Sequence, residues 1–331
     1  MTRSRRDVLL GSALAVAVIG VSFGADAENL RFMTGPQGGS WYPMGGAIKN
    51  IVEEAVPDTS LQVMPGAGIA NVKAIEAGKA DLGFANSVST VDAINGKPPF
   101  EEKATNVCHI ATLYPQYFQI VTTADTGIES LDQLKGREVT TQPTGNTGEA
   151  ITAHLVEAAG LSYDDLAGVD LVSYNDSVAL LKDGNSEVFT LGTTVPASAI
   201  MDLASARDIK LLEIDDAMLA KMQEMNPGYQ RIEIPAGSYP GQDEAVPTIG
   251  YATHLVARCD LPDETVSGIL EQIVDHQQDL ASVAKAIGDS TLEQMATKMG
   301  VPLHPPPRRP GRTRGDLRPH VGGMDRARSI P

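Results

Sequence analysis

Residues 28–56 read ENLRFMTGPQGGSWYPMGGAIKNIVEEAV. An apolar, strand-like run from Asn29 to Thr34 leads through a Gly-rich loop into a helical period from Met44 to Val56. This is the strand–loop–helix unit of α/β proteins. The alternation then repeats, with strands expected at Leu61–Met64 and Asp81–Ala85 and helices at Ile69–Ala77 and Ser87–Asn95. The stretch therefore predicts an α/β fold.

A second α/β series occupies the middle of the chain. Strands are expected at Glu138–Thr141, Asp170–Ser173, Glu187–Leu191 and Ile209–Leu212, and helices at Gly148–Ala159, Ser177–Lys182 and Ala197–Ala206. Long, mostly apolar runs at Val107–Thr123 and Thr248–Arg258 flank this series, and helices at Asp263–Leu280 and Thr291–Met299 close the chain. Two series joined by two long strands predict two lobes with a double crossover and a hinge. Clefts between such lobes bind small ligands.

The N-terminal 27 residues are expected to be a cleaved export signal. Arg3, Arg5 and Arg6 precede an apolar run over residues 8–23, and Ala25-Asp26-Ala27 is a small-x-small cleavage pattern. The apolar run is shorter than the ~20 residues that a membrane anchor needs. Both a Sec and a twin-arginine signal fit these residues. We therefore expect a periplasmic protein that begins near Glu28.

The charge and the far end of the chain restrict the function further. The 331 residues include 26 basic and 42 acidic side chains, so the net charge is −16. A negative charge of this size argues against nucleic acid as a partner. Residues 305–331, PPPRRPGRTRGDLRPHVGGMDRARSIP, have an abruptly different composition. They fit either a basic disordered tail or the product of a shifted reading frame, so we infer neither fold nor function from them.

Three loops that precede helices carry the candidate binding residues. The first contains Gly39, Ser40, Trp41 and Tyr42, where glycines permit close backbone approach and two aromatics stand together on a turn. The second ends at Asn71, and the third contains Asn146, Thr147 and Gly148. Helix N-termini offer unpaired N–H groups to an anion. The predicted ligand site is completed by Asn86, Ser87 and Thr193.

Catalytic and metal-binding patterns are weak in this chain. Ser282-Val283-Ala284-Lys285 matches S-x-x-K but lacks the motifs that accompany it in enzymes. The six histidines show no paired metal spacing, and Cys108-His109 fits a buried strand better than a ligand pair. There is no Walker A motif, and the dinucleotide fingerprint is incomplete at residues 65–71. The sequence favours a binding protein that needs no metal or cofactor, with no catalytic residues assigned.

The ordered motifs resemble one receptor family. GPQGGSWYPMGGAI, GAGIANVKAIEAGKADLGFAN and HIATLYPQYFQIV, followed by GIESLDQLKGREV and the TGNTG helix start, resemble the TAXI family, the substrate-binding receptors of tripartite (TRAP) transporters. The resemblance extends over residues 28–305 and implies a two-lobed, periplasmic-binding-protein-like (type II) fold. Lobe one would comprise residues 28–115 plus 255–304, and lobe two residues 116–254.

The function that the resemblance implies is capture of a small organic anion, a carboxylate or amino acid, for a TRAP-type membrane permease. This chain has Glu149 after Asn146-Thr147-Gly148, where many relatives have an arginine, which weakens the case for glutamate itself. Two alternatives stay open: a periplasmic enzyme on the same fold that acts on a small carboxylated substrate, and a ligand-reporting subunit of a sensor.

The two cysteines are predicted to form a disulfide. Cys108 lies at the start of the first long strand, and Cys259 lies just past the end of the second. If these strands run antiparallel, both thiols fall at the same end of the hinge, in an oxidising compartment. Two isolated buried thiols are the alternative, because a shift of one residue in register would point the side chains apart.

Overall fold

The computed structural model describes residues 28–36, 39–297 and 300–305. The predicted export signal and nearly all of the basic tail lie outside these residues.

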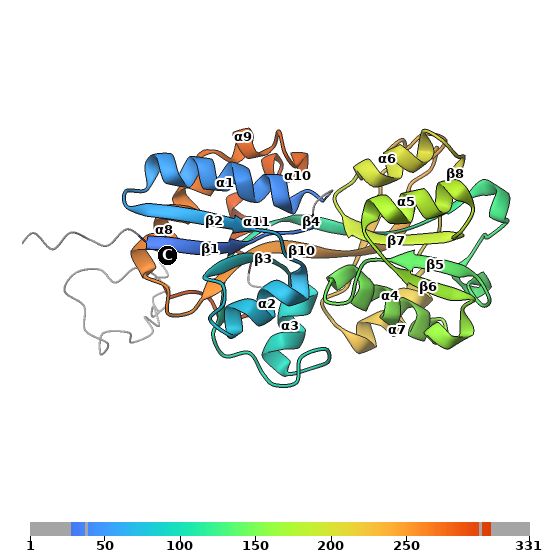
Figure 1. Ribbon diagram of the computed structural model, residues 1–331, viewed down its shortest axis with the longest axis horizontal. Coiled ribbons are helices and arrows are strands. Elements are labelled where there is room, and N and C mark those ends of the chain that lie inside the picture. Colours follow the sequence, from blue (N-terminus) through green and yellow to red (C-terminus); the bar gives the residue numbers. More distant parts are fainter. Residues whose placement is uncertain (1–27, 37–38, 298–299, 306–331) are drawn as a thin grey trace, which may run out of the picture.

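The first lobe is built from the two ends of the described chain. Its N-terminal part is an alternating α/β series, and its C-terminal part is a run of helices that packs beside α1 (Figure 1). Its elements are β1 (Glu28–Met33), α1 (Trp41–Ala55), β2 (Thr59–Met64), α2 (Gly68–Glu76), β3 (Leu82–Asn86), α3 (Ser87–Asn95), α8 (Asp263–Asp275), α9 (Gln277–Leu280), α10 (Lys285–Gly288) and α11 (Leu292–Met295).

The second lobe is formed by the middle of the chain. Helices α5 and α6 cover one face of its strands, and α4 and α7 cover the other (Figure 1). Its elements are β5 (Glu138–Thr141), α4 (Thr147–Ala158), β6 (Gly168–Leu171), α5 (Tyr174–Asp183), β7 (Val188–Thr193), α6 (Ser198–Ala204), β8 (Ile209–Leu211), α7 (Asp216–Met225) and β9 (Gln230–Ile234).

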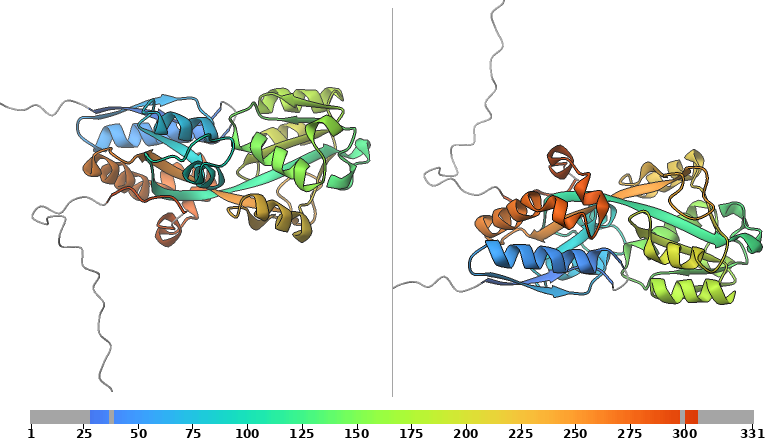
Figure 2. Two further views of the ribbon diagram at one scale, coloured as in Figure 1. Left: turned by 90° about the horizontal axis from the view of Figure 1, so that it is seen from below. Right: turned by 90° about the horizontal axis from the view of Figure 1, so that it is seen from above.

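Two long antiparallel strands connect the lobes. β4 (Val107–Thr123) leaves the first lobe and β10 (Val246–Arg258) returns to it, and both run the length of the molecule in the two views of Figure 2. They lie at the centre of one sheet of order β2-β1-β3-β10-β4-β7-β5-β6, with β8 beside β4 and β9 beside β10. The predicted double crossover is confirmed. The predicted lobe boundaries fall inside β4 and β10 and stay a prediction.

Each lobe is stabilised by apolar cores of its own. One core of the first lobe packs Phe32, Met44 and Ile48 against Leu255 and Ile269. Burial of such side chains contributes about 1.5–3 kcal/mol each. The second lobe has a core on each face of its strands, one around α4 and α7 and the other around α5 and α6. Each lobe therefore has its own core, and β4 and β10 contribute to both.

The disulfide between Cys108 and Cys259 is confirmed. Cys108 pairs with Ala257 in the antiparallel register of β4 and β10, which brings Cys259 alongside. The two Cα atoms are 5.0 Å apart and the sulfurs are bonded. The bridge lies at the first-lobe end of the crossover strands.

The expected closing helices were too long. The expected helix Asp263–Leu280 is divided at His276, whose backbone leaves the helical region, and α9 turns so that Leu280 is fully buried in the first-lobe core. Burial of this side chain is worth more than continuing the helix. The expected helix Thr291–Met299 comprises only α11 among the described residues. α7 and β9 were not predicted.

Candidate functional site

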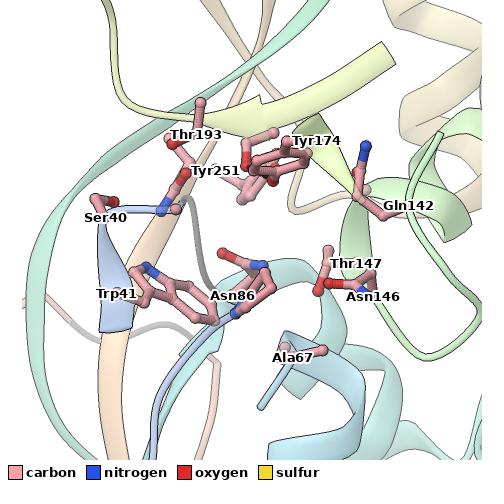
Figure 3. Close-up of a pocket in the computed structure, with 16 residues that line it drawn as sticks. Ser40, Trp41, Ala67, Asn86, Gln142, Asn146, Thr147, Tyr174, Thr193 and Tyr251 are labelled. Atoms are coloured by element: carbon pink, nitrogen blue, oxygen red, sulfur yellow. Dashed lines mark hydrogen bonds between the residues drawn. The ribbon is translucent and has the colours of Figure 1, made fainter. Parts of the chain in front are cut away.

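A small polar cavity lies between the two lobes. Its volume is about 40 Å³, and both lobes and both crossover strands contribute to its wall. In Figure 3, Ser40 and Thr193 lie at one end of the cavity and Asn146 and Thr147 at the other. The lining consists of Pro36, Gly39, Ser40, Trp41, Ala67, Gly68, Asn86, Gln116, Gln142, Asn146, Thr147, Gly148, Tyr174, Gly192, Thr193 and Tyr251.

The first-lobe wall is centred on Trp41, the first residue of α1. Its indole is 7% exposed and packs 5.7 Å from the ring of Phe84. The indole N–H donates to Thr253 Oγ1 on β10 at 3.2 Å, so the ring orientation is fixed from both sides. Asn86, which ends β3 and precedes α3, lies beside Trp41 in Figure 3. Trp41 thus provides a rigid apolar surface next to the side-chain amide of Asn86.

The second-lobe wall is formed where β5 and β7 end. Gln142 follows β5, and its Nε2 donates to the carbonyl of Thr190 at 2.6 Å. The Tyr174 hydroxyl donates to the carbonyl of Gly192 at 3.1 Å. In a parallel sheet, the carboxyl ends of strands and the helix starts that follow them are the usual place for a ligand.

Three buried amide oxygens of the cavity wall have no hydrogen-bond partner among the residues that the structure describes. Asn86 Oδ1, Gln116 Oε1 and Gln142 Oε1 come from the first lobe, β4 and the second lobe, and each side chain is at least nine-tenths buried. An unpaired buried acceptor costs about 1–3 kcal/mol, and native proteins pair nearly all of them. A ligand that donates hydrogen bonds would remove this cost.

Within the described part of the chain, no Lys, Arg, His, Asp or Glu lines the cavity. Burial raises the pKa of Tyr174 and of Tyr251 well above the usual range, so both phenols stay neutral. Positive potential comes instead from helices α1, α2, α3 and α4, all of which begin at the cavity. None of their N-cap side chains bonds to the helix that it precedes. The Ala70 N–H in the first turn of α2 donates to the Gly145 carbonyl, and first-turn N–H groups that stay unpaired attract anions.

Most of the predicted binding residues meet at this cavity. The lining includes Gly39, Ser40, Trp41, Asn86, Asn146, Thr147, Gly148 and Thr193. Three predicted residues lie elsewhere, and their contacts explain why. Tyr42 is 37% exposed on α1, next to Trp41 but outside the lining. Ser87 faces a different hollow, and its Oγ accepts from the Ala252 N–H at 3.0 Å.

Asn71 is the third residue that does not line the cavity. It is fully buried, and its side chain bonds to backbone only. Its Oδ1 accepts from the Ala67 N–H at 3.0 Å, and its Nδ2 donates to the carbonyls of Thr34 at 2.7 Å and Phe84 at 2.8 Å. Asn71 therefore holds the first two loops in place and has no group free for a ligand.

The sequence reasoning missed four polar residues of the wall: Gln116, Gln142, Tyr174 and Tyr251. Gln142 lies two residues before the TGNTG segment, and Tyr174 directly follows an expected strand, so both carried a positional signal. Gln116 and Tyr251 lie opposite each other within the paired crossover strands. A polar residue inside a long strand has no local pattern that marks it as a binding residue.

Other site types are not seen in the described residues. No group of three or more His, Cys, Asp or Glu side chains is placed to hold a metal ion among residues 28–36, 39–297 and 300–305. Within the same residues, no helix combines the length and apolar character needed to cross a membrane.

Comparison with known proteins identifies the family. The chain belongs to the NMT1-like family, whose model matches residues 32–309. The fold is similar to that of a putative L-cystine ABC transporter protein from Listeria monocytogenes, with 14% identity over 81% of this chain and 99% of that chain and a TM-score of 0.50. A match also exists to the periplasmic aliphatic sulphonate binding protein SsuA from Escherichia coli, with 14% identity over 81% and 79% of the two chains and a TM-score of 0.48. The topology and the likeness to the Listeria protein show the two-lobed, type II periplasmic-binding-protein fold.

Proposed function

We propose that this member of the NMT1-like family is an exported solute-binding receptor that captures a small organic anion, a carboxylate or an amino acid, between its lobes. The observation that carries the proposal is the interlobe cavity. Helix starts from both lobes converge there, and three buried amide oxygens have no partner among residues 28–36, 39–297 and 300–305. Backbone N–H groups would bind the anionic end of the ligand, and the amide oxygens would accept from its N–H or O–H groups.

Closure of the lobes on the ligand is the working step of such a receptor. Because β4 and β10 connect the lobes, a bend in these strands would open the cavity to solvent. A ligand that contacts both walls stabilises the closed form, and that form would dock on the membrane permease. The chemistry is capture and release, and the ligand leaves unchanged.

The partner that we propose is a TRAP-type permease in the cytoplasmic membrane. The resemblance of the ordered motifs to TAXI receptors supports this choice. The export signal expected at residues 1–27 supports a periplasmic location. The disulfide between Cys108 and Cys259 agrees with it, because such bonds persist in oxidising compartments.

A thermal-shift screen of carboxylates, amino acids and keto acids tests the function, since a ligand that binds only the folded state raises the melting temperature. Substitution of Trp41 by Ala should weaken binding of any hit at least tenfold, because the apolar wall of the cavity is lost. Thr147→Val should weaken it by a smaller factor through loss of a hydroxyl.

The matched control is Tyr42→Ala, which removes the adjacent aromatic side chain outside the cavity and should leave affinity unchanged. Equal affinities of the Trp41→Ala variant and the parent would refute the site. Conversion of a bound compound to product would identify an enzyme instead of a receptor.

A further inference from the structure

The side-chain amide of Gln142 has a fixed orientation. Its Nε2 donates to the Thr190 carbonyl at 2.6 Å, and a flip of the amide would set two oxygens against each other. Gln142 Oε1 therefore points away from Thr190. A Cβ atom at Gly148 would overlap this oxygen, so the glycine leaves Oε1 uncovered. This position of the cavity wall accepts a hydrogen bond and cannot donate one.

The two other unpaired oxygens reach the same cavity from different parts of the molecule. Asn86 ends β3 in the first lobe, and in Figure 3 it lies between Trp41 and Thr147. Gln116 lies on β4, and its Nε2 donates to Thr253 Oγ1 at 2.6 Å. Because the cavity volume is only about 40 Å³, one bound group can face all three oxygens. A hydroxyl brings one donor, a carboxamide two and an ammonium group three, so an ammonium group matches them.

The lining of the cavity also restricts the net charge of the ligand. None of the described residues that line it is Lys, Arg, His, Asp or Glu. A buried ion without a counter-charge is costly, so neither an isolated ammonium nor an isolated carboxylate is balanced there. A ligand that carries both groups brings its own counter-charge. The lining therefore favours a zwitterion over either ion alone.

The start of α4 offers the donors that the carboxylate of such a zwitterion needs. The N–H groups of Thr147 and Gly148 donate no hydrogen bond within the described chain, and both residues line the cavity. Unpaired N–H groups at a helix start bind carboxylates. Gln142 Oε1 lies against Gly148, so the acceptor for the ammonium and the donors for the carboxylate are adjacent. This adjacency matches two groups on one carbon atom.

A larger hollow beside the cavity has room for the rest of the ligand. Its volume is about 390 Å³, and it shares Gly39, Ser40, Tyr174 and Thr193 with the cavity. Its lining mixes hydroxyl-bearing and apolar side chains, and among the described residues it includes no charged one. A second ionised group would therefore have no counter-charge in either space.

We propose that the cavity selects the zwitterionic head of an α-amino acid with an uncharged side chain. Its ammonium group donates to Asn86, Gln116 and Gln142, and its carboxylate accepts from the start of α4. The inference rests on the proposed function and narrows its ligand class. Because the three oxygens come from the first lobe, a crossover strand and the second lobe, a ligand with an ammonium group stabilises the closed form and its deaminated analogue does not.

The test is calorimetric titration of the purified protein at pH 7 with alanine and three analogues. Propionate lacks the ammonium group, lactate has a hydroxyl in its place, and ethylammonium lacks the carboxylate. Alanine should bind at least ~100-fold more tightly than each analogue, because each leaves buried groups unpaired or a charge unbalanced. Glutamine should bind at least ~10-fold more tightly than glutamate, which has the same shape and one more charge.

Asn86→Asp places a charged acceptor opposite the ammonium group and breaks no hydrogen bond of Asn86 Oδ1 within the described chain. It should tighten alanine binding about tenfold and weaken propionate binding. Asn95→Asp is the matched control, since it adds the same charge to the exposed end of α3 and should change neither affinity. Gln116→Met removes another acceptor with little change in shape. It should weaken alanine binding about tenfold and leave propionate unaffected, even if Asn86→Asp folds poorly.

The possible failures of the inference and of the proposed function are distinguishable. Propionate or lactate binding as tightly as alanine, or glutamate as tightly as glutamine, would overturn the inference and leave an anion receptor. An alanine affinity that neither Asn86→Asp nor Gln116→Met changes would also overturn it. If no compound of the series binds, the inference is overturned, and the thermal-shift screen alone then decides the proposed function.

Discussion

Asn71 and Asn86 occupy two neighbouring regions of the first lobe and differ in the hydrogen bonds that their side chains make. Both are buried, at 0% and 6% exposure, and both lie near a helix start: Asn71 in the first turn of α2, and Asn86 at the end of β3 directly before α3. Both polar atoms of the Asn71 side chain bond to backbone, whereas Asn86 Oδ1 has no partner in the described part of the chain. Burial alone does not distinguish a structural amide from one available to a ligand. The two kinds of amide are distinguished by the number of hydrogen bonds that each already makes within the protein.

Asn71→Ala should have the largest effect on stability, a loss of about 3 kcal/mol in the free energy of unfolding. The substitution leaves the Ala67 N–H and the carbonyls of Thr34 and Phe84 without their amide partner in a buried site. Urea denaturation measures the change. A loss below about 1 kcal/mol would mean that water or neighbouring groups replace these bonds, and the contrast with Asn86 would fail.

Acid should have an intermediate effect, because some buried polar groups of the first lobe are paired only while neutral. His109 and His254 stack with 2.9 Å between their Nδ1 atoms, and burial lowers the pKa of His109 to about 4. The unfolded chain therefore takes up protons first as the pH falls below about 6.5, and stability declines from there towards pH 4. We expect a loss of about 2 kcal/mol over that interval.

Chemical denaturation at a series of pH values measures this loss. His109→Gln should flatten the decline, since the titrating group is removed. His276→Gln provides the control, because His276 is exposed and distant from the pair. An unchanged slope in the His109→Gln variant would assign the acid sensitivity to other groups.

Asn86→Ala should have the smallest effect on stability, within about 0.5 kcal/mol of the parent, because no side-chain hydrogen bond is lost and one unpaired acceptor is removed. Its effect should appear in ligand binding instead, as a weakening of about tenfold, the usual scale for one lost hydrogen bond. The same denaturation and titration experiments measure both quantities. A large loss of stability with unchanged affinity would reverse the roles assigned to the two asparagines.

The long strands and the loops before helices could be predicted because their signals are local. β4 was predicted with its observed limits from one long apolar run, and the antiparallel pairing of β4 and β10 placed Cys108 beside Cys259. The loops that contain Ser40 and Thr147 were predicted from glycine and capping residues that depend only on nearby sequence.

The remaining features depend on neighbours far away in the chain. The partners of Asn71 lie up to 38 residues away, and Gln116 is placed by Thr253 on another strand. The break at His276 follows from the space that the first-lobe core leaves for Leu280. No local pattern encodes these distances, so a sequence alone cannot separate Asn71 from Asn86 or identify Gln116.

The bridge between Cys108 and Cys259 has a consequence for proteolysis. The two cysteines are 151 residues apart in sequence, and all of the second lobe lies between them. A single cut anywhere in that interval leaves two fragments joined through the disulfide, whereas a cut before Cys108 or after Cys259 releases a free piece. Electrophoresis of the nicked protein with and without reductant therefore reports which lobe a protease has entered, and a receptor cut once in its second lobe stays covalently one molecule.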